Sequence, residues 1–321
     1  MQGLVTVFGG SGFLGRQIVR ALTKQGHRVR VAVRQTARAY EMRLYGDVGQ
    51  VEIVQANIRN PASVARALDG AEAVVNVIGI IHEGGRQRFG SVHAMGARTI
   101  AEAAKAAGIS RFVQISALGA DSASASRYYA SKAEGEAAVR EVLPSAVIVR
   151  PSVIFGPGDT LFNRFAQMAQ VLPALPLIGG GETRFQPVYV IDVARAIAAA
   201  LADSATAGRT YELGGPAVHT AKELYELTLK ETMRQRYLAP LPFPIAALIG
   251  LGGDIFASVL PYAPPITSDQ VQMLKTDCVV SAGALGLADL GVAATRLEPI
   301  LPTYLYRYRK GGQYAEQFKP A

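Results

Sequence analysis

The 321-residue chain is poor in the residues from which disulfides and metal centres are built. Its single cysteine, Cys278, excludes an internal disulfide and any iron–sulfur or zinc site that needs several cysteines. The four histidines lie far apart and without the spacing typical of metal ligands, so no metal site is expected. These histidines are His27, His82, His93 and His219.

The sequence also lacks a targeting or membrane-spanning segment. No basic region followed by an apolar core stands at the N-terminus, so no secretory signal is expected. The uncharged run 237–253 has three prolines near its start, at positions 240, 242 and 244. These prolines exclude one uninterrupted membrane helix there. We therefore expect either a cytosolic bacterial chain or one whose leader has been removed.

The overall balance of residues indicates a folded protein with an acidic partner. Half of the residues are apolar and 18% are charged, which is typical of globular proteins. The formal net charge of +8 suits an anionic cofactor, a membrane surface, an acidic protein or nucleic acid. No motif for DNA or RNA binding accompanies this charge, so nucleic acid is not expected as a partner.

A glycine-rich loop follows the first predicted strand. Residues 3–8 are β-branched or aromatic and bounded by glycine, which predicts a buried strand, and residues 16–22 have a helical pattern. Between them, Gly9, Gly12 and Gly15 allow a sharp turn, close approach to a pyrophosphate, and packing of the helix on the strand. This arrangement predicts a dinucleotide-binding loop; the alternative is a glycine-rich turn without a ligand.

The end of the second predicted strand, 28–34, distinguishes between the two nicotinamide dinucleotides. A carboxylate there would bind the ribose 2′-hydroxyl of NAD, but the residue is Arg34. Because a guanidinium group binds phosphate oxygens in two places, Arg34 favours NADPH, with Arg16 and Arg38 sharing the charge. The alternative is that these arginines are solvated surface residues.

Strands and helices continue to alternate as far as residue 215. This rhythm predicts an α/β fold with a doubly wound parallel sheet, followed by a smaller and mostly helical C-terminal subdomain. The further predicted strands are 51–56, 73–79, 111–115, 146–149 and 210–215, and the predicted helices are 61–68 and 94–107. We expect the dinucleotide-binding domain to comprise 1–155 and 183–215, and the subdomain 156–182 and 216–321.

A serine, a tyrosine and a lysine form the candidate catalytic group. Ser116 follows a predicted strand at the edge where such sheets bind ligands. Tyr128 and Lys132 are four residues apart and so share a helix face, where the ammonium group would lower the pKa of the phenol and make it a proton donor or acceptor. The alternative is an ordinary amphipathic helix with one exposed aromatic residue and one exposed lysine.

The last third of the chain loses the alternating rhythm. Thr220 and Glu223 predict a capped helix over 220–236. The stretch 237–265 is apolar and has one charge, Asp254; it is either the core of a small substrate domain or a surface that rests on a membrane. The run 304–310 alternates aromatic and basic residues and suits a final helix with a wet basic face or a docking strip for a protein.

These motifs resemble the short-chain dehydrogenase/reductase superfamily in its extended or atypical branch. The resemblance covers residues 3 to about 215 and rests on the glycine loop, residues 57–58 and 76–79, the Ser116, Tyr128 and Lys132 group, and segments 150–157 and 188–194. The cofactor-binding residues that motif and resemblance together imply are Gly9, Gly10, Ser11, Gly12, Phe13, Leu14, Gly15, Arg16, Arg34, Asn57, Ile58, Val77, Ile78, Gly79, Ser116, Tyr128, Lys132, Pro151, Ser152 and Val153.

One residue departs from this pattern. Active extended members usually carry an asparagine in the helix after the fourth strand, where it supports a proton relay, and His93 stands there in this chain. The resemblance therefore implies a retained cofactor site with a doubtful relay.

A subgroup resembles the chain over nearly its whole length: the nucleotide-binding accessory subunits of respiratory complex I. The similarity extends to 126–128, 132–136, 187–193, 241–244, 264–271 and 289–292. It implies NADPH held as a structural ligand, other complex I subunits as partners, and a peripheral place on the cytoplasmic side of the bacterial inner membrane, equivalent to the mitochondrial matrix side. The membrane surface would then be met through 237–265.

Two hypotheses follow. The first is a non-catalytic NADPH-binding subunit that supports the assembly or stability of complex I. The second is an NADP-dependent oxidoreductase that transfers hydride to or from a carbonyl or hydroxyl substrate, with catalytic Ser116, Tyr128 and Lys132. The first is favoured, because Tyr128 and Lys132 can also hold a ribose without any chemistry.

Overall fold

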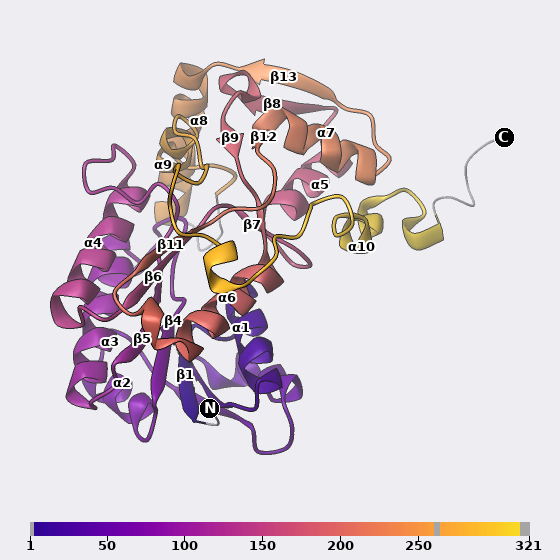
Figure 1. Ribbon diagram of the computed structural model, residues 1–321. Coiled ribbons are helices and arrows are strands. Elements are labelled where there is room, and N and C mark those ends of the chain that lie inside the picture. Colours follow the sequence, from indigo (N-terminus) through magenta and orange to yellow (C-terminus); the bar gives the residue numbers. More distant parts are fainter. Residues whose placement is uncertain (1–2, 260–263, 315–321) are drawn as a thin grey trace.

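Seven parallel strands form the central sheet of the computed structural model, which describes residues 3–259 and 264–314 (Figure 1). Their order is β3-β2-β1-β4-β5-β6-β11, so the chain starts at the centre and builds first one edge and then the other. This is the predicted doubly wound α/β sheet. The strands are β1 (Leu4–Phe8), β2 (Arg28–Val33), β3 (Val51–Gln55), β4 (Ala73–Asn76), β5 (Arg111–Ile115), β6 (Val147–Pro151) and β11 (Thr210–Leu213).

Helices cover both faces of the sheet, because successive side chains of each strand point to opposite faces. Val5 and Val7 of β1 pack with the apolar stripe of α1, whereas Phe8 packs with the helices on the other face. One layer consists of α1 (Phe13–Lys24) and α6 (Val190–Ala202), and the other of α2 (Pro61–Leu68), α3 (Met95–Ala106) and α4 (Arg127–Val142). The sheet is therefore buried on both faces, as parallel sheets usually are.

Local chemistry explains where several predicted elements end. The predicted strand 73–79 ends at Asn76, because the Asn76 side chain turns back and accepts a hydrogen bond from the Ile78 amide at 3.1 Å. The predicted helix 94–107 begins at Met95, after a π-helical turn, η2 (Gly90–Ala94). The predicted capping box of Thr220 and Glu223 is confirmed, but its helix ends at Glu231.

A second group of elements packs beside the carboxyl edge of the sheet and surrounds two further apolar clusters. These elements are β7 (Ile154–Phe155), α5 (Leu161–Val171), β8 (Ala174–Ile178), η3 (Gly179–Gly181), β9 (Arg184–Phe185), β10 (Val188–Tyr189), β12 (His219–Thr220), α7 (Ala221–Glu231), β13 (Tyr237–Leu241), α8 (Phe243–Val259), α9 (Ser268–Met273) and α10 (Pro302–Leu305). Short 3-10 turns complete the chain: η1 (Thr36–Tyr45), η4 (Ser204–Thr206), η5 (Ala288–Leu290) and η6 (Tyr306–Tyr308).

The basic and aromatic run 304–310 contains the end of α10 and the turn η6, and it has one buried and one exposed side. Tyr304, Leu305 and Tyr308 are buried with α5 and α7, and Arg309 forms an ion pair with Glu231. Tyr306 and Arg307 are exposed, so only part of this run belongs to the core.

Three predicted ranges extend beyond the part that the structure describes. Residues 1–2 of the dinucleotide-binding domain, 260–263 of the apolar stretch, and 315–321 of the C-terminal subdomain lie outside it. None of the helices in the described part has both the length and the apolar character needed to cross a bilayer.

Candidate functional site

The glycine loop joins β1 to α1 at the centre of the carboxyl edge of the sheet. Gly9 has a φ of +83°, a conformation that favours glycine. A Cβ atom on Gly15 would lie 2.3 Å from the Gly9 carbonyl oxygen, so only glycine lets α1 approach the loop this closely. The N-cap residue of α1, Gly12, offers no side chain to the first turn, which leaves the positive end of the helix open to an anion.

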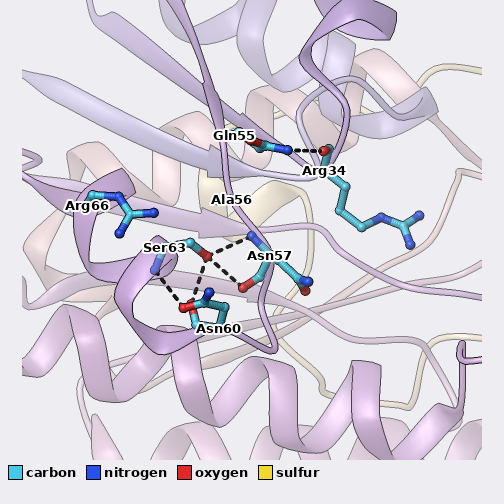
Figure 2. Close-up of a pocket in the computed structure, with 7 residues that line it drawn as sticks. All are labelled: Arg34, Gln55, Ala56, Asn57, Asn60, Ser63 and Arg66. Atoms are coloured by element: carbon cyan, nitrogen blue, oxygen red, sulfur yellow. Dashed lines mark hydrogen bonds between the residues drawn. The ribbon is translucent and has the colours of Figure 1, made fainter.

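A pocket of about 310 Å³ lies at the ends of β2 and β3, and β2 pairs with β1, the strand that leads into the glycine loop. Figure 2 shows Arg34 and Arg66 on either side of a hydrogen-bonded cluster of Asn57, Asn60 and Ser63. In that cluster the Ser63 hydroxyl lies 3.0 Å from both the amide and the carbonyl oxygen of Asn57. A polar, hydrogen-bonded wall between two cations suits the ribose-phosphate end of a dinucleotide.

Arg16 and Arg38, the arginines predicted to share the charge of Arg34, lie in α1 and η1. Arg16 forms an ion pair of 2.5 Å with Glu41 and donates a hydrogen bond to the Ser11 carbonyl. Arg34 is exposed, and within the described residues its guanidinium forms no ion pair. Arg66 was missed by the sequence analysis, because it reaches the pocket from the end of α2 and shares no motif with Arg34.

The neighbours of the glycine loop include other predicted residues. A Cβ atom on Gly9 would meet the side chains of Val77 and Ile78 at 3.2 and 3.1 Å, so these two residues line the loop. Ile58 is buried against α3, where a Cβ on Gly96 would lie 2.4 Å from its side chain. Phe13 and Leu14 begin the first turn of α1 directly after Gly12, and Gly10 and Ser11 lie in the loop before it.

Ser116, Tyr128 and Lys132 meet at the same edge, beyond β4 and β5. The Lys132 ammonium lies 5.8 Å from the centre of the Tyr128 ring and donates a hydrogen bond to the Ile115 carbonyl at 3.4 Å. A Cβ on Gly79 would lie 3.1 Å from that ammonium nitrogen. The Ser116 hydroxyl is buried and has no hydrogen-bond partner among the described residues. An unpaired buried hydroxyl beside a poorly paired ammonium suits a ligand that supplies the missing hydrogen bonds, such as a ribose.

The expected activation of Tyr128 by Lys132 is not seen. Burial raises the pKa of the Tyr128 phenol, and a nearby Cys278 adds to this effect. Burial also lowers the pKa of Lys132 to about 8, although Glu136 raises it in part. The protein therefore holds a neutral phenol and a weakened ammonium, a combination suited to hydrogen bonding.

His93 occupies the place of the relay asparagine and has both ring nitrogens in use. Its Nε2 accepts a hydrogen bond from the Ile80 amide at 3.0 Å, and its Nδ1 lies 2.9 Å from the Ser131 hydroxyl. That hydroxyl donates to the Tyr128 carbonyl, so Nδ1 carries the proton. Burial and the charge of Lys132 lower the pKa of His93 to about 3. His93 is thus a neutral brace that holds the backbone around residue 80 against α4.

Pro151, Ser152 and Val153 are tied into the structure at the end of β6. The Ser152 hydroxyl donates to the Cys278 carbonyl at 2.8 Å, and the Val153 carbonyl accepts from the Val188 amide. The Pro151 carbonyl accepts from the Leu118 amide. The first of these contacts fastens residue 278 to the end of β6, and the other two fasten the segment 151–153 to its neighbours.

Comparison with known proteins places this site in context. Residues 5–214 match the NAD dependent epimerase/dehydratase family. The chain is 39% identical, over 316 residues, to the mitochondrial NADH dehydrogenase [ubiquinone] 1 alpha subcomplex subunit 9 of Arabidopsis thaliana; the match covers 96% of this chain and 79% of the plant protein. It is 41% identical over 198 residues to a ceramide reductase of Caulobacter vibrioides, which covers 62% of this chain and 61% of that protein.

A solved structure supports the fold assignment. The dTDP-glucose 4,6-dehydratase DesIV of Streptomyces venezuelae, determined with NAD and TYD bound, superimposes with a TM-score of 0.73. The match covers 98% of this chain and 100% of that one, at 22% identity. This likeness concerns the fold alone.

Proposed function

Because the chain belongs to the NAD dependent epimerase/dehydratase family and, within it, to the family of the alpha subcomplex subunit 9 of mitochondrial NADH dehydrogenase, we propose that it is a non-catalytic, NADPH-holding accessory subunit of respiratory complex I. The similarity over 96% of this chain carries the proposal, because it includes the last third, which lies beyond the region common to the larger family. A bound dinucleotide would stabilise the fold by mass action.

The geometry supports the binding of a nicotinamide dinucleotide along the carboxyl edge of the sheet. The glycine loop and the open end of α1 would hold the pyrophosphate, and Tyr128, Lys132 and Ser116 would hold the ribose at the nicotinamide end. When bound, NADPH would supply a hydride for reduction. The subunit proposal requires only that the cofactor be held.

Arg34 is proposed to bind the 2′-phosphate that distinguishes NADPH from NADH. Replacing it removes a charge-assisted hydrogen bond, so Arg34→Ala should weaken NADPH binding by about 10- to 100-fold and leave NADH binding nearly unchanged. Titration of cofactor fluorescence measures both affinities. Arg28→Ala is the matched control, because Arg28 lies at the opposite end of the same strand. An equal loss of NADPH and NADH affinity would contradict the assignment.

The proposed position is peripheral, on the cytoplasmic side of a bacterial inner membrane, with the subdomain 156–182 and 216–321 facing the partner. The support comes from α8, whose large aliphatic residues point outward. Leu248 is 71% exposed and Ile255 is 61% exposed, whereas the buried residues of the helix are small. The other exposed members are Ile245, Ile249, Leu251 and Phe256. An outward apolar face of this kind suits the headgroup region of a bilayer.

Cations lie beside the same helix. The loop after β4 approaches α8, where a Cβ on Gly84 would lie 3.7 Å from the Ala257 carbonyl oxygen. This loop carries exposed Arg86 and Arg88, and the exposed Arg127 at the start of α4 forms an ion pair with Glu83 in the same loop. Arg86 forms no ion pair among the described residues, so its free charge beside the apolar face favours a membrane with anionic lipids.

The subunit proposal is tested by affinity purification of the tagged full chain from gently solubilised membranes of its own source. We expect NADH:quinone oxidoreductase activity and one NADPH per chain to co-elute. The double variant Leu248→Gln, Ile255→Gln should lose the activity from the eluate and keep its NADPH. Leu44→Gln, Val48→Gln is the matched control, because both residues are exposed apolar side chains in and after η1. Recovery of the wild-type chain alone would overturn the proposal.

A second function is favoured by one specific observation, the similarity to a ceramide reductase over 198 residues. Ser116, Tyr128 and Lys132 are all present, so the chain retains the groups for an NADPH-dependent reduction of a carbonyl, with hydride from the cofactor and a proton from Tyr128. Tyr128→Phe separates the two functions. Complex assembly and NADPH content should survive this change if the chain is a subunit, whereas turnover should collapse if it is a reductase.

A further inference from the structure

A second pocket, of about 550 Å³, lies between the loop after β4, the start of α4, and helices α8 and α9. None of its lining residues belongs to the predicted cofactor site. The two regions are nevertheless neighbours. Phe89 lines the pocket, and its ring lies edge to face with the ring of Tyr128 at 5.9 Å between centres. A molecule in this pocket would therefore sit beside the predicted nicotinamide end.

The charged residues of the pocket disfavour an anionic ligand. Three carboxylates, those of Glu83, Asp254 and Asp269, line it together with the guanidinium groups of Arg88 and Arg127. Both arginines are already paired with Glu83, Arg127 at 2.6 Å and Arg88 at 3.8 Å. A phosphate would meet an excess of negative charge and no unpaired cation among the described lining residues.

The carboxylates serve to build the pocket. Glu83 accepts a hydrogen bond from the Phe89 amide at 2.7 Å. Asp269 accepts from the amides of Arg127 and Tyr128 at 2.6 and 3.1 Å and thereby caps α4. Asp254 accepts from the Ser268 amide at 3.3 Å. The walls are therefore polar, and hydrogen bonds to backbone amides hold their carboxylates in place. Such walls suit an uncharged group that donates and accepts hydrogen bonds.

The remaining wall is apolar and continues onto the outer face of α8. Ala247 and Ala257 of α8 line the pocket. Residues four apart on a helix are neighbours, so Leu251 follows Ala247 along one row and Ile255 follows Leu251. Both Leu251 and Ile255 are exposed. A chain that leaves the pocket past Ala247 would thus run directly along the exposed apolar face.

From this continuity we infer that the pocket binds the uncharged polar head of a long-chain amphiphile, whose hydrocarbon chain lies along the outer face of α8. The inference rests on the proposed contact of α8 with a membrane, from which such a molecule would enter.

The test uses N-hexanoylsphingosine with a fluorophore on its acyl chain, its 1-phosphate, and UDP-glucose as probes of the full NADPH-loaded chain. The first has an uncharged head, the second has the same tail with an anionic head, and the third has no tail. We expect saturable binding of the uncharged amphiphile, at least about tenfold weaker binding of its phosphate, and no competition by UDP-glucose. Competition by UDP-glucose would overturn the inference.

A pair of variants locates the binding site. Ala247→Phe fills the pocket and should weaken binding of the uncharged probe by about tenfold or more. Val48→Phe adds a ring of similar size at an exposed residue after η1, outside both the pocket and α8, and should leave the affinity within about twofold. NADPH content and thermal midpoint confirm that both variants fold. Equal binding by the two variants would overturn the inference.

A vesicle assay separates this inference from the proposed membrane contact. Vesicles of phosphatidylcholine and phosphatidylglycerol are sedimented with wild type and with Leu248→Gln, Ile255→Gln. Vesicle binding without probe binding would overturn the pocket assignment and keep the membrane contact. Probe binding without vesicle binding would overturn the membrane contact and support the pocket.

Discussion

Helices α1 and α8 differ in which of their residues are buried and which are exposed. In α1 the large apolar residues Ile18, Val19 and Leu22 are fully buried against the sheet. Among the described side chains of α8 the buried positions are Ala246, Gly250, Gly253 and Ala257, and the large apolar residues from Ile245 to Phe256 face outward. The closest contact of each helix is made at a glycine, Gly15 in α1 and Gly253 in α8. Backbone atoms of neighbouring segments therefore set the orientation of both helices.

The contact of α8 shows why the helix does not turn its leucines inward. A Cβ on Gly253 would lie 1.8 Å from the Ile266 carbonyl oxygen, and one on Gly250 would lie 2.7 Å from the Ser268 amide nitrogen. Segment 266–268 therefore lies directly against the backbone of α8, with no space for larger residues. A helix held in this orientation exposes apolar surface that the described residues do not cover, as the proposed membrane contact requires.

The largest expected difference between the two helices concerns single leucines. Leu22→Ala leaves a cavity in the core and should lower the free energy of unfolding by about 2–5 kcal/mol. Leu248→Ala should lower it by less than about 0.5 kcal/mol, because the side chain is exposed in the isolated chain. Urea unfolding of the two variants measures both values. A large loss for Leu248→Ala would break the comparison, since it would place this side chain in the core.

The glycine contact of α8 gives a second, smaller difference. Gly253→Ala forces a methyl group against the Ile266 carbonyl and should cost about 1–3 kcal/mol of stability. The adjacent Gly252 is exposed with no atom within 4 Å of a Cβ, so Gly252→Ala should be neutral or stabilise by up to about 1 kcal/mol. Thermal unfolding distinguishes the pair. Equal effects would show that close approach does not set the orientation of α8.

The smallest expected effect concerns a buried charged group, the ammonium of Lys132, and the pH dependence of stability that it causes. Burial lowers the pKa of Lys132 to about 8, below its ordinary value of 10.5. Above pH 8 the folded cofactor-free protein releases this proton while the unfolded chain keeps it. The free energy of unfolding should therefore rise with pH by up to about 1.4 kcal/mol per unit between pH 8 and about 9.5, and the contribution is constant below that window.

Chemical unfolding of wild type and Lys132→Met across this range isolates the slope. We expect the variant to lose it, whereas Lys105→Met, which replaces an exposed lysine of α3, should keep it. Parallel pH profiles for wild type and Lys132→Met would falsify the assignment of the slope to this residue. The measurement stays below about pH 9.5 because unfolded tyrosines lose protons above it.

Local patterns were sufficient for the dinucleotide-binding half of the molecule. Strand, glycine loop and helix follow one another within residues 4–24, and each is defined by side-chain periodicity or by a backbone conformation that glycine favours. The i, i+4 spacing placed Tyr128 and Lys132 on one face of α4. These features depend on neighbours in the chain, so the sequence predicted them.

Other features depend on residues brought together from far along the chain. The partner of His93 is Ser131, 38 residues away, and Ser152 binds the Cys278 carbonyl across 126 residues. The pKa of Tyr128 follows from its burial and not from the nearby lysine. No local pattern reports such burial or such distant contacts.

The sequence alone determined the doubly wound sheet, the phosphate-binding loop and the apolar character of 237–265, because periodicity and glycine spacing act over a few residues. Tertiary structure alone decided which face of α8 points outward and that a braced polar pocket adjoins it. The reason is steric: the close approach of segment 266–268 selects the small residues of α8 for the interior and leaves its large ones at the surface.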